Sequence, residues 1–170
     1  MLKTILAMVL CLGIVRHAAA ADTLVKFKGG IGVIPVSSGV GQAPTAEVVN
    51  RNIVRGVQPP GQPWVIADLR AEVRFDGSIS VRGKGLLLAG GNGIGTNANA
   101  RVFATLICEA AAPFTQRNTN LAGVPLQPNG DFRIDDVLSP APAGCASPVL
   151  LIRNAANASW FAAGIEDLGD

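Results

Sequence analysis

The sequence predicts an all-β protein: a single antiparallel β-sandwich, immunoglobulin-like or similar, closed by one disulfide bond. Valine- and isoleucine-rich segments alternate with clusters of Gly, Pro, Asn and Asp at short spacing, and no segment after residue 20 keeps a helical period for three turns. Apolar residues make up 49% of the 170 residues, which excludes a disordered chain. The 20 Gly and 11 Pro follow no collagen-like period.

The N-terminal segment 1–20 has the pattern of a secretory signal peptide. Lys3 gives a basic start, an apolar run follows over 4–15, and Ala18–Ala20 supplies the small residues that signal peptidase needs. The apolar run is too short to span a bilayer. We therefore expect a mature domain over 21–170 that is secreted or periplasmic, with no stable membrane insertion after cleavage.

Removal of this segment changes the chemical inventory of the chain. Lys3 and Arg16 leave, so 12 of the 14 basic residues remain against 12 acidic ones, and the net charge falls from +2 to zero. His17, the only histidine, and both methionines leave as well, and the chain has no tyrosine. Without histidine, a serine or cysteine nucleophile has no usual base, and zinc or copper lacks its commonest ligand. We expect no cofactor, no metal site and no nucleic-acid partner, and the inventory argues against an enzyme.

Two cysteines remain in the mature chain, Cys108 and Cys145. In an exported protein such a pair most simply forms a disulfide. A redox or nucleophilic role is disfavoured because neither a CxxC spacing nor a histidine partner is present. In the chain-entropy model, closing this loop stabilises the fold by about 4 kcal/mol.

Strands are predicted wherever a β-rich segment lies between turn signals, and one helical turn is expected within 110–119. The predicted strands are Thr23–Lys28, Gly32–Val36, Glu47–Val57, Trp64–Phe75, Ser78–Ala89, Arg101–Glu109, Val124–Gln127, Asp131–Leu138, Pro148–Arg153 and Ser159–Ile165. The predicted core residues are Phe27, Leu69, Val73, Ile79, Val81, Leu106, Phe132, Ile134, Leu151 and Trp160.

The segment 64–89 gives the clearest prediction, a hairpin with one solvated face. A two-residue turn at Asp76-Gly77 would place charged side chains opposite apolar ones on the same face. A three-residue loop, Phe75-Asp76-Gly77, instead pairs Val73 with Ile79, Ala71 with Val81 and Asp68 with Lys84. We therefore predict the longer loop, with Gly77 in the left-handed conformation of a G1 bulge.

The same register leaves four apolar side chains on the nominally solvated face: Trp64, Ile66, Leu86 and Leu88. One interpretation is that another strand covers them. The other is an exposed apolar patch that binds a protein or a glycan, bordered by the Gly- and Asn-rich loop 90–99 and its residue Asn92.

Three carboxylates, Asp131, Asp135 and Asp136, follow the turn at 128–130. Paired carboxylates across a cleft perform glycosidase chemistry, so a carboxylate-based hydrolase acting on carbohydrate is the alternative function. Solvated strand and turn carboxylates are the simpler interpretation.

The C-terminal third contains GDFRI at 130–134, CASPVLLI at 145–152 and WFA at 160–162. These segments resemble small secreted bacterial β-rich proteins of unassigned function, in which a cysteine pair closes the domain. The resemblance implies export and β structure, and it carries over no catalytic or binding residue. We therefore expect an exported, non-catalytic module with a structural or ligand-binding role.

Overall fold

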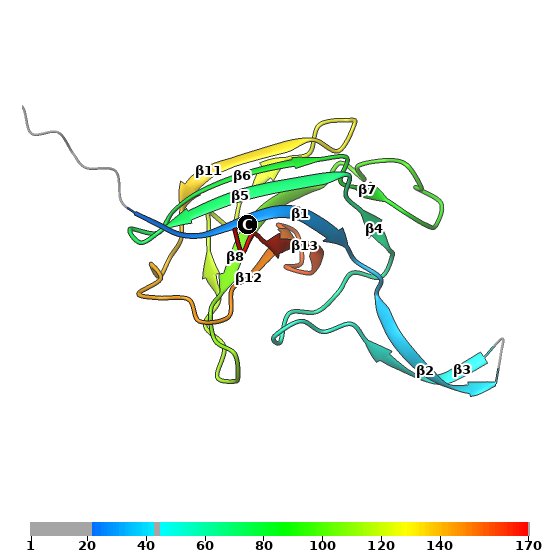
Figure 1. Ribbon diagram of the computed structural model, residues 1–170. Helices are drawn as coiled ribbons and strands as arrows, with labels where there is room; N and C mark the ends of the chain where they lie inside the picture. The colour runs from blue at the N-terminus through cyan, green and yellow to red at the C-terminus, as the bar shows by residue number, and fades with distance from the viewer. Residues whose placement is uncertain (1–21, 43–44, 170) are drawn as a thin grey trace, which may run out of the picture.

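A computed structural model describes residues 22–42 and 45–169, and within them the chain forms strands and loops but no helix (Figure 1). The predicted all-β class is confirmed. The predicted signal segment 1–20 lies outside the described residues. The strands are β1 (Thr23–Gly32), β2 (Val36–Gln42), β3 (Thr45–Arg51), β4 (Trp64–Val65), β5 (Asp68–Arg74), β6 (Ser78–Lys84), β7 (Leu87–Leu88), β8 (Arg101–Ile107), β9 (Arg117–Asn118), β10 (Val124–Pro125), β11 (Phe132–Val137), β12 (Val149–Asn154) and β13 (Trp160–Glu166).

Nine of these strands form one antiparallel sheet with the order β10-β8-β12-β13-β1-β5-β6-β11, and β9 pairs with β8. The predicted sandwich is not confirmed, because β13 pairs with β12 on one side and with β1 on the other. β12, β13 and β1 therefore belong to one continuous sheet, whereas a sandwich would divide its strands between two separate sheets. At the two ends of the sheet, β10 and β11 lie close together, and the Gln127 amide donates to the Asp131 carbonyl at 2.8 Å. The sheet is therefore barrel-like.

Curvature of the sheet is concentrated where its pairing is irregular. The register between β1 and β13 shifts between Phe27 and Gly30, and Gly29 has a φ of 95°, which only glycine adopts without strain. A bulge of this kind bends a strand and increases its twist. Gly29 lies between Lys28, the last residue of β1 paired with β5, and Gly30, where pairing with β13 resumes.

The interior of the curved sheet is filled by the apolar residues that alternate along its strands. All ten predicted core residues are buried there. They belong to one continuous cluster. Alternation identifies the inner face of β5, β6 and β11, whereas consecutive residues are buried in β8 and β12.

The predicted hairpin register is confirmed in β5 and β6. Val73 pairs with Ile79, and Asp68 pairs with Lys84. Gly77 has a φ of 85°, and its amide donates to the Arg74 carbonyl at 3.0 Å. The three-residue loop therefore fixes which side chains of both strands face solvent.

Several predicted elements differ in detail. The segments 64–75 and 78–89 each break into two strands, and the short pieces β4 and β7 pair with each other outside the main sheet. The expected helical turn within 110–119 is absent: bends and the two-residue strand β9 occupy it. The ribbon of β2 and β3 pairs only with itself and projects from the sheet (Figure 1).

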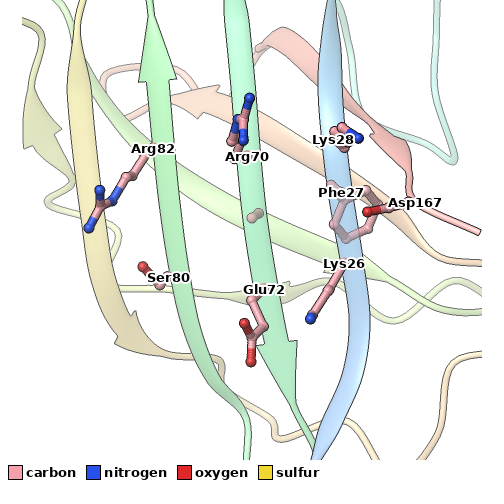
Figure 2. A pocket seen from close by; sticks show the side chains of 9 residues that line it. Lys26, Phe27, Lys28, Arg70, Glu72, Ser80, Arg82 and Asp167 are labelled. Carbon is pink, nitrogen blue, oxygen red and sulfur yellow. The ribbon is translucent and has the colours of Figure 1, made fainter. Parts of the chain in front are cut away.

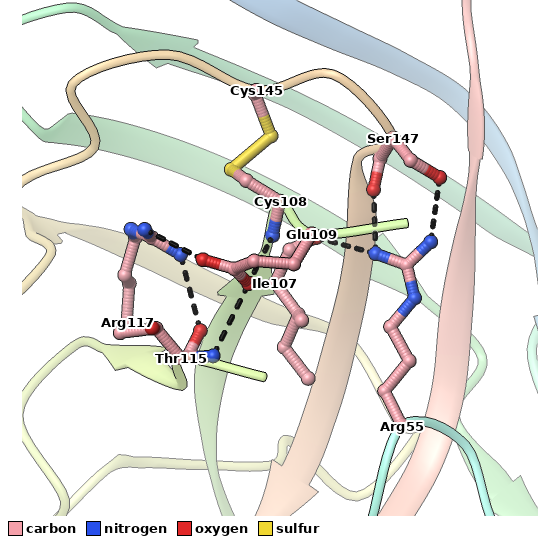
Figure 3. Close-up of a disulfide and its surroundings, with 8 residues drawn as sticks. All are labelled: Arg55, Ile107, Cys108, Glu109, Thr115, Arg117, Cys145 and Ser147. Carbon is pink, nitrogen blue, oxygen red and sulfur yellow. Dashed lines mark hydrogen bonds and ion pairs between the residues drawn. A yellow bond between two sulfur atoms is a disulfide. The ribbon is translucent and has the colours of Figure 1, made fainter. Parts of the chain in front are cut away.

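Cys108 and Cys145 form the predicted disulfide, with their Cα atoms 4.4 Å apart (Figure 3). It ties the end of β8 to the loop that precedes β12. The Arg55 guanidinium reaches the same loop, donating to the carbonyl and the hydroxyl of Ser147 and to the carbonyl of Ile107. This end of the protein is therefore held by a covalent bond and by hydrogen bonds to a single cation.

An ion pair lies beside the disulfide, between Glu109 and Arg117, at 2.9 Å (Figure 3). The Arg117 guanidinium lowers the pKa of the Glu109 carboxyl from its usual 4.5 to about 2, and the Thr115 amide contributes a further hydrogen bond. The Glu109 side chain thereby fixes the bend that follows β8.

No helix among residues 22–42 and 45–169 has the length and apolar character needed to cross a membrane.

Candidate functional site

The solvent-facing side of β1, β5, β6 and β11, here called the outer face, carries most of the charged residues of these strands. Its central feature is a row of directly opposed residues, one from each strand. These are Lys28, Arg70, Arg82 and Arg133, here called the cation row. Lys28 pairs with Arg70, Arg70 with Arg82, and Arg82 with Arg133, so four like charges lie side by side. Figure 2 shows the first three in one band across β1, β5 and β6.

Local sequence and register explain how the row is assembled. Alternation along each strand sends every second side chain to solvent, and the partners on the inner face are core residues. The loop at Gly77 sets β5 against β6 so that Arg70 meets Arg82. A register slip by one residue would turn both cations toward the core. The core packing that determines the register of β5 and β6 therefore also determines the position of the cation row.

Two members of the row have carboxylate partners and two do not. Arg70 Nε lies 3.4 Å from an oxygen of Asp68. Arg133 donates to both carboxylate oxygens of Asp135, which raises the pKa of the guanidinium. The side chains of Lys28 and Arg82 form no hydrogen bond or ion pair within the described part of the chain. They are exposed cations free to bind an external anion.

The neighbouring row has mixed charge and runs through Lys26, Glu72, Ser80 and Asp135. The Thr23 hydroxyl and the Arg74 guanidinium lower the pKa of Glu72. Hydrogen bonds from Arg133 and Ser80 lower that of Asp135. Both carboxylates are therefore ionised at neutral pH and hold cations in place.

Between these rows lies a shallow depression of about 290 Å³, lined by Lys26, Lys28, Arg70, Glu72 and Arg82 among others (Figure 2). Taken together, the outer face of the four strands carries seven cationic side chains and three anionic ones: Lys26, Lys28, Arg70, Arg74, Arg82, Lys84 and Arg133 against Asp68, Glu72 and Asp135. Asp167, which follows β13, also lines the depression, and residues 21–170 carry 12 basic and 12 acidic side chains, so this face is more basic than the rest of the surface.

The carboxylates predicted as hydrolase candidates are all engaged in hydrogen bonds, and Asp135 and Asp136 line a depression of about 340 Å³ together with Glu72. Asp131 accepts a hydrogen bond from the Gly85 amide, Asp136 from the Asn120 amide, and Asp135 is ion-paired. Glu72 and Asp135 share one row, but the pKa of each is lowered, whereas a glycosidase acid needs a raised pKa. Within 22–42 and 45–169, no three His, Cys, Asp or Glu side chains gather as a metal site would require.

The exposed apolar patch predicted at the far end of the hairpin is absent as a surface. Trp64, Leu86 and Leu88 are 4%, 0% and 7% exposed and belong to the core, Ile66 is half-buried, and only Asn92 is fully on the surface. Of the two interpretations of these side chains, burial therefore agrees with the structure and an exposed patch does not, because both long strands break. β4 and β7 turn away from the sheet and pair with each other, and this carries their side chains inward.

Sequence reasoning missed the cation row, although part of its signal was present. The predicted hairpin register already placed Arg70 opposite Arg82. Lys28 and Arg133 come from strands whose pairing with β5 and β6 depends on long-range contacts, which no local pattern reveals.

Comparison with protein-family models, with curated proteins and with solved structures found no match.

Proposed function

We propose that this protein is an exported, non-catalytic binding module whose outer face holds a linear acidic polysaccharide, with the sugar carboxylates on the cation row. The observation that carries the proposal is the direct opposition of four cationic side chains across four adjacent strands. Like charges placed directly opposite each other destabilise a sheet, so the arrangement has a cost that an anionic ligand would offset.

The geometry of the row favours a linear polymer with regularly repeated charge. Neighbouring strands lie about 4.8 Å apart, so the row extends for about 14 Å. Successive sugar rings of an extended polyuronate point their carboxylates to different sides of the chain, so the cation row can meet those carboxylates that the polymer turns toward the protein. The hydroxyl oxygen of Ser80 and the carboxylates of Glu72 and Asp135 line the depressions beside the row and can accept hydrogen bonds from sugar hydroxyls.

A nucleic acid fits this face less well. Single-stranded nucleic acids bind through aromatic side chains on which bases stack, in addition to cations. Neither the cation row nor the mixed-charge row contains an aromatic residue. Export is supported by the signal pattern of 1–20 and by the disulfide, which is typical of oxidising compartments.

The test is calorimetric titration of the mature protein at about 50 mM salt with polygalacturonate, neutral dextran and single-stranded DNA. We expect binding of polygalacturonate that weakens as salt rises, and none of dextran. Equal binding of dextran, or tighter binding of DNA, would overturn the proposal.

Variants locate the site. Replacing Arg70 and Arg82 together by Gln removes two exposed ionic contacts of about 0.5–1 kcal/mol each, so the affinity should fall about tenfold. The matched control is Arg51→Gln, an exposed arginine at the end of β3 that has no carboxylate partner among the described residues and lies outside the outer face. An equal loss in both variants would contradict the assignment.

A further inference from the structure

A cavity of about 470 Å³ lies away from the outer face, where β4, the start of β8 and the turn between β12 and β13 meet. Its aromatic side is Trp64, stacked on Phe161 with ring centroids 3.9 Å apart and planes 14° apart. Leu121 and the methyl groups of Ala155 and Ala156 supply further apolar lining. The volume falls in the range of small-molecule sites, and the lining is mostly apolar as such sites require.

The rim of the cavity is held in a strained but well-fixed conformation. Ala98 and Asn99 have φ values of 49° and 50°, in the left-handed region that alanine rarely adopts. The Asn97 side chain clamps this turn, donating to the carbonyls of Leu126 and Gln127 and accepting from the Asn99 amide. A strained backbone conformation persists only where the surrounding contacts hold it in place, and such residues are concentrated at ligand sites.

One cation stands at the rim. Arg101 Nε donates to the Ala122 carbonyl at 2.8 Å, and Nη2 donates to the Gly123 carbonyl. These bonds fix the guanidinium but leave Nη1 without a hydrogen-bond partner in the described residues. No carboxylate lines the cavity, and Arg101 forms no ion pair there. A positive charge is therefore fixed beside an apolar cavity with nothing in the described chain to neutralise it.

We propose that this cavity binds a small apolar carboxylic acid. Its hydrocarbon part lies against Leu121, Ala155 and Ala156, above the small exposed edge of Trp64, and its carboxylate accepts a hydrogen bond from Arg101 Nη1. This site is separate from the outer face and does not depend on the function proposed for it. Charge complementarity at Arg101 selects an acid over a neutral molecule of the same shape.

The probes are 4-phenylbutyrate and its neutral counterpart 4-phenyl-1-butanol, titrated by calorimetry into the mature protein. We expect saturable binding of the acid, about tenfold tighter than that of the alcohol, as a charge-assisted hydrogen bond implies. Equal affinities for acid and alcohol, or no binding of either, would overturn the proposal.

Two variants test the location. Ala156→Phe fills the cavity from an exposed turn and should abolish binding of both probes. Leu121→Asp changes a side chain that is 58% exposed, so folding is not at risk, and it places a like charge beside the carboxylate. This variant should lower the affinity for the acid about tenfold and the affinity for the alcohol much less. Arg51→Gln, at an exposed arginine of β3 that lines neither the cavity nor the cation row, should leave both affinities unchanged. Retention of acid binding in Leu121→Asp would contradict the site.

Discussion

Arg82 lies between two other cations, so reversing its charge should stabilise the fold while it removes a proposed ligand contact. Its directly opposed neighbours are Arg70 and Arg133, and its nearest compensating charge is Asp135. In Arg82→Glu both repulsions become attractions, and the attraction to Asp135 becomes a repulsion. Two interactions become favourable and one becomes unfavourable, so the net change in electrostatic energy equals that of reversing the sign of one interaction.

The magnitude follows from Coulomb's law. Two unit charges about 7 Å apart in water interact by about 0.6 kcal/mol, so reversing the sign of one pair changes the energy by about 1.2 kcal/mol. At about 0.15 M salt, screening reduces this by roughly half. We expect Arg82→Glu to raise the free energy of unfolding by about 1 kcal/mol at low salt and by about 0.5 kcal/mol at physiological salt. Arg82→Gln should give about half of each gain.

Urea unfolding of the three proteins at about 20 mM and 500 mM salt measures these differences. The gain in the free energy of unfolding should shrink as salt rises. Polygalacturonate affinity should fall from the wild type to Arg82→Gln and further to Arg82→Glu, which is the order in which stability rises. Destabilisation of Arg82→Glu at low salt, or a gain that does not depend on salt, would refute the electrostatic reasoning about the cation row.

Three further predictions concern the fold. Replacing Cys108 and Cys145 by Ala should lower the free energy of unfolding by about 4 kcal/mol, measured by urea unfolding, and a loss below about 1 kcal/mol would contradict the chain-entropy account. Gly83→Ala should destabilise by about 1–3 kcal/mol, because a Cβ there would overlap the Phe132 ring; unchanged thermal unfolding would show that the ring moves freely. The pKa of Glu109 is depressed from its usual 4.5 to about 2, so its ion pair stabilises the protein fully above about pH 5, and this contribution is lost as pH falls from about 4.5 to about 2. Glu109→Gln should lose this part of the acid dependence, and identical acid-unfolding curves for the two proteins would contradict it.

Local pattern predicted much of the fold. Alternation over 64–89, with the requirement that Val73 and Ile79 share a buried face, was enough to determine the hairpin register. It was also enough to identify the core side of β5 and β6, but not of β8 and β12, where consecutive residues are buried. Both inferences rest on interactions between residues close in sequence or on a simple two-fold period.

The sheet's closure and its functional face depend on contacts far apart in sequence. The pairing of β1 with β13 joins residues near both ends of the chain, and it converts the expected sandwich into a curved sheet. The breaks near Ile66 and Gly85, which bury Trp64 and Leu88, arise from packing against β13 and from pairing between β4 and β7. The predicted patch failed for that reason.

The central claim, that the cation row is an anion-binding site, is tested most directly by a two-dimensional NMR titration of ¹⁵N-labelled mature protein with hexagalacturonate. Arginine Nε–Hε signals report the row itself, and backbone amides report the strands that carry it. The account predicts saturable shifts at Arg70, Arg82 and Arg133 and at the amides of 26–28, with the signals of β8 and β12 unmoved. Shifts confined to loops or to strands outside the outer face, or no shifts at low salt, would contradict it.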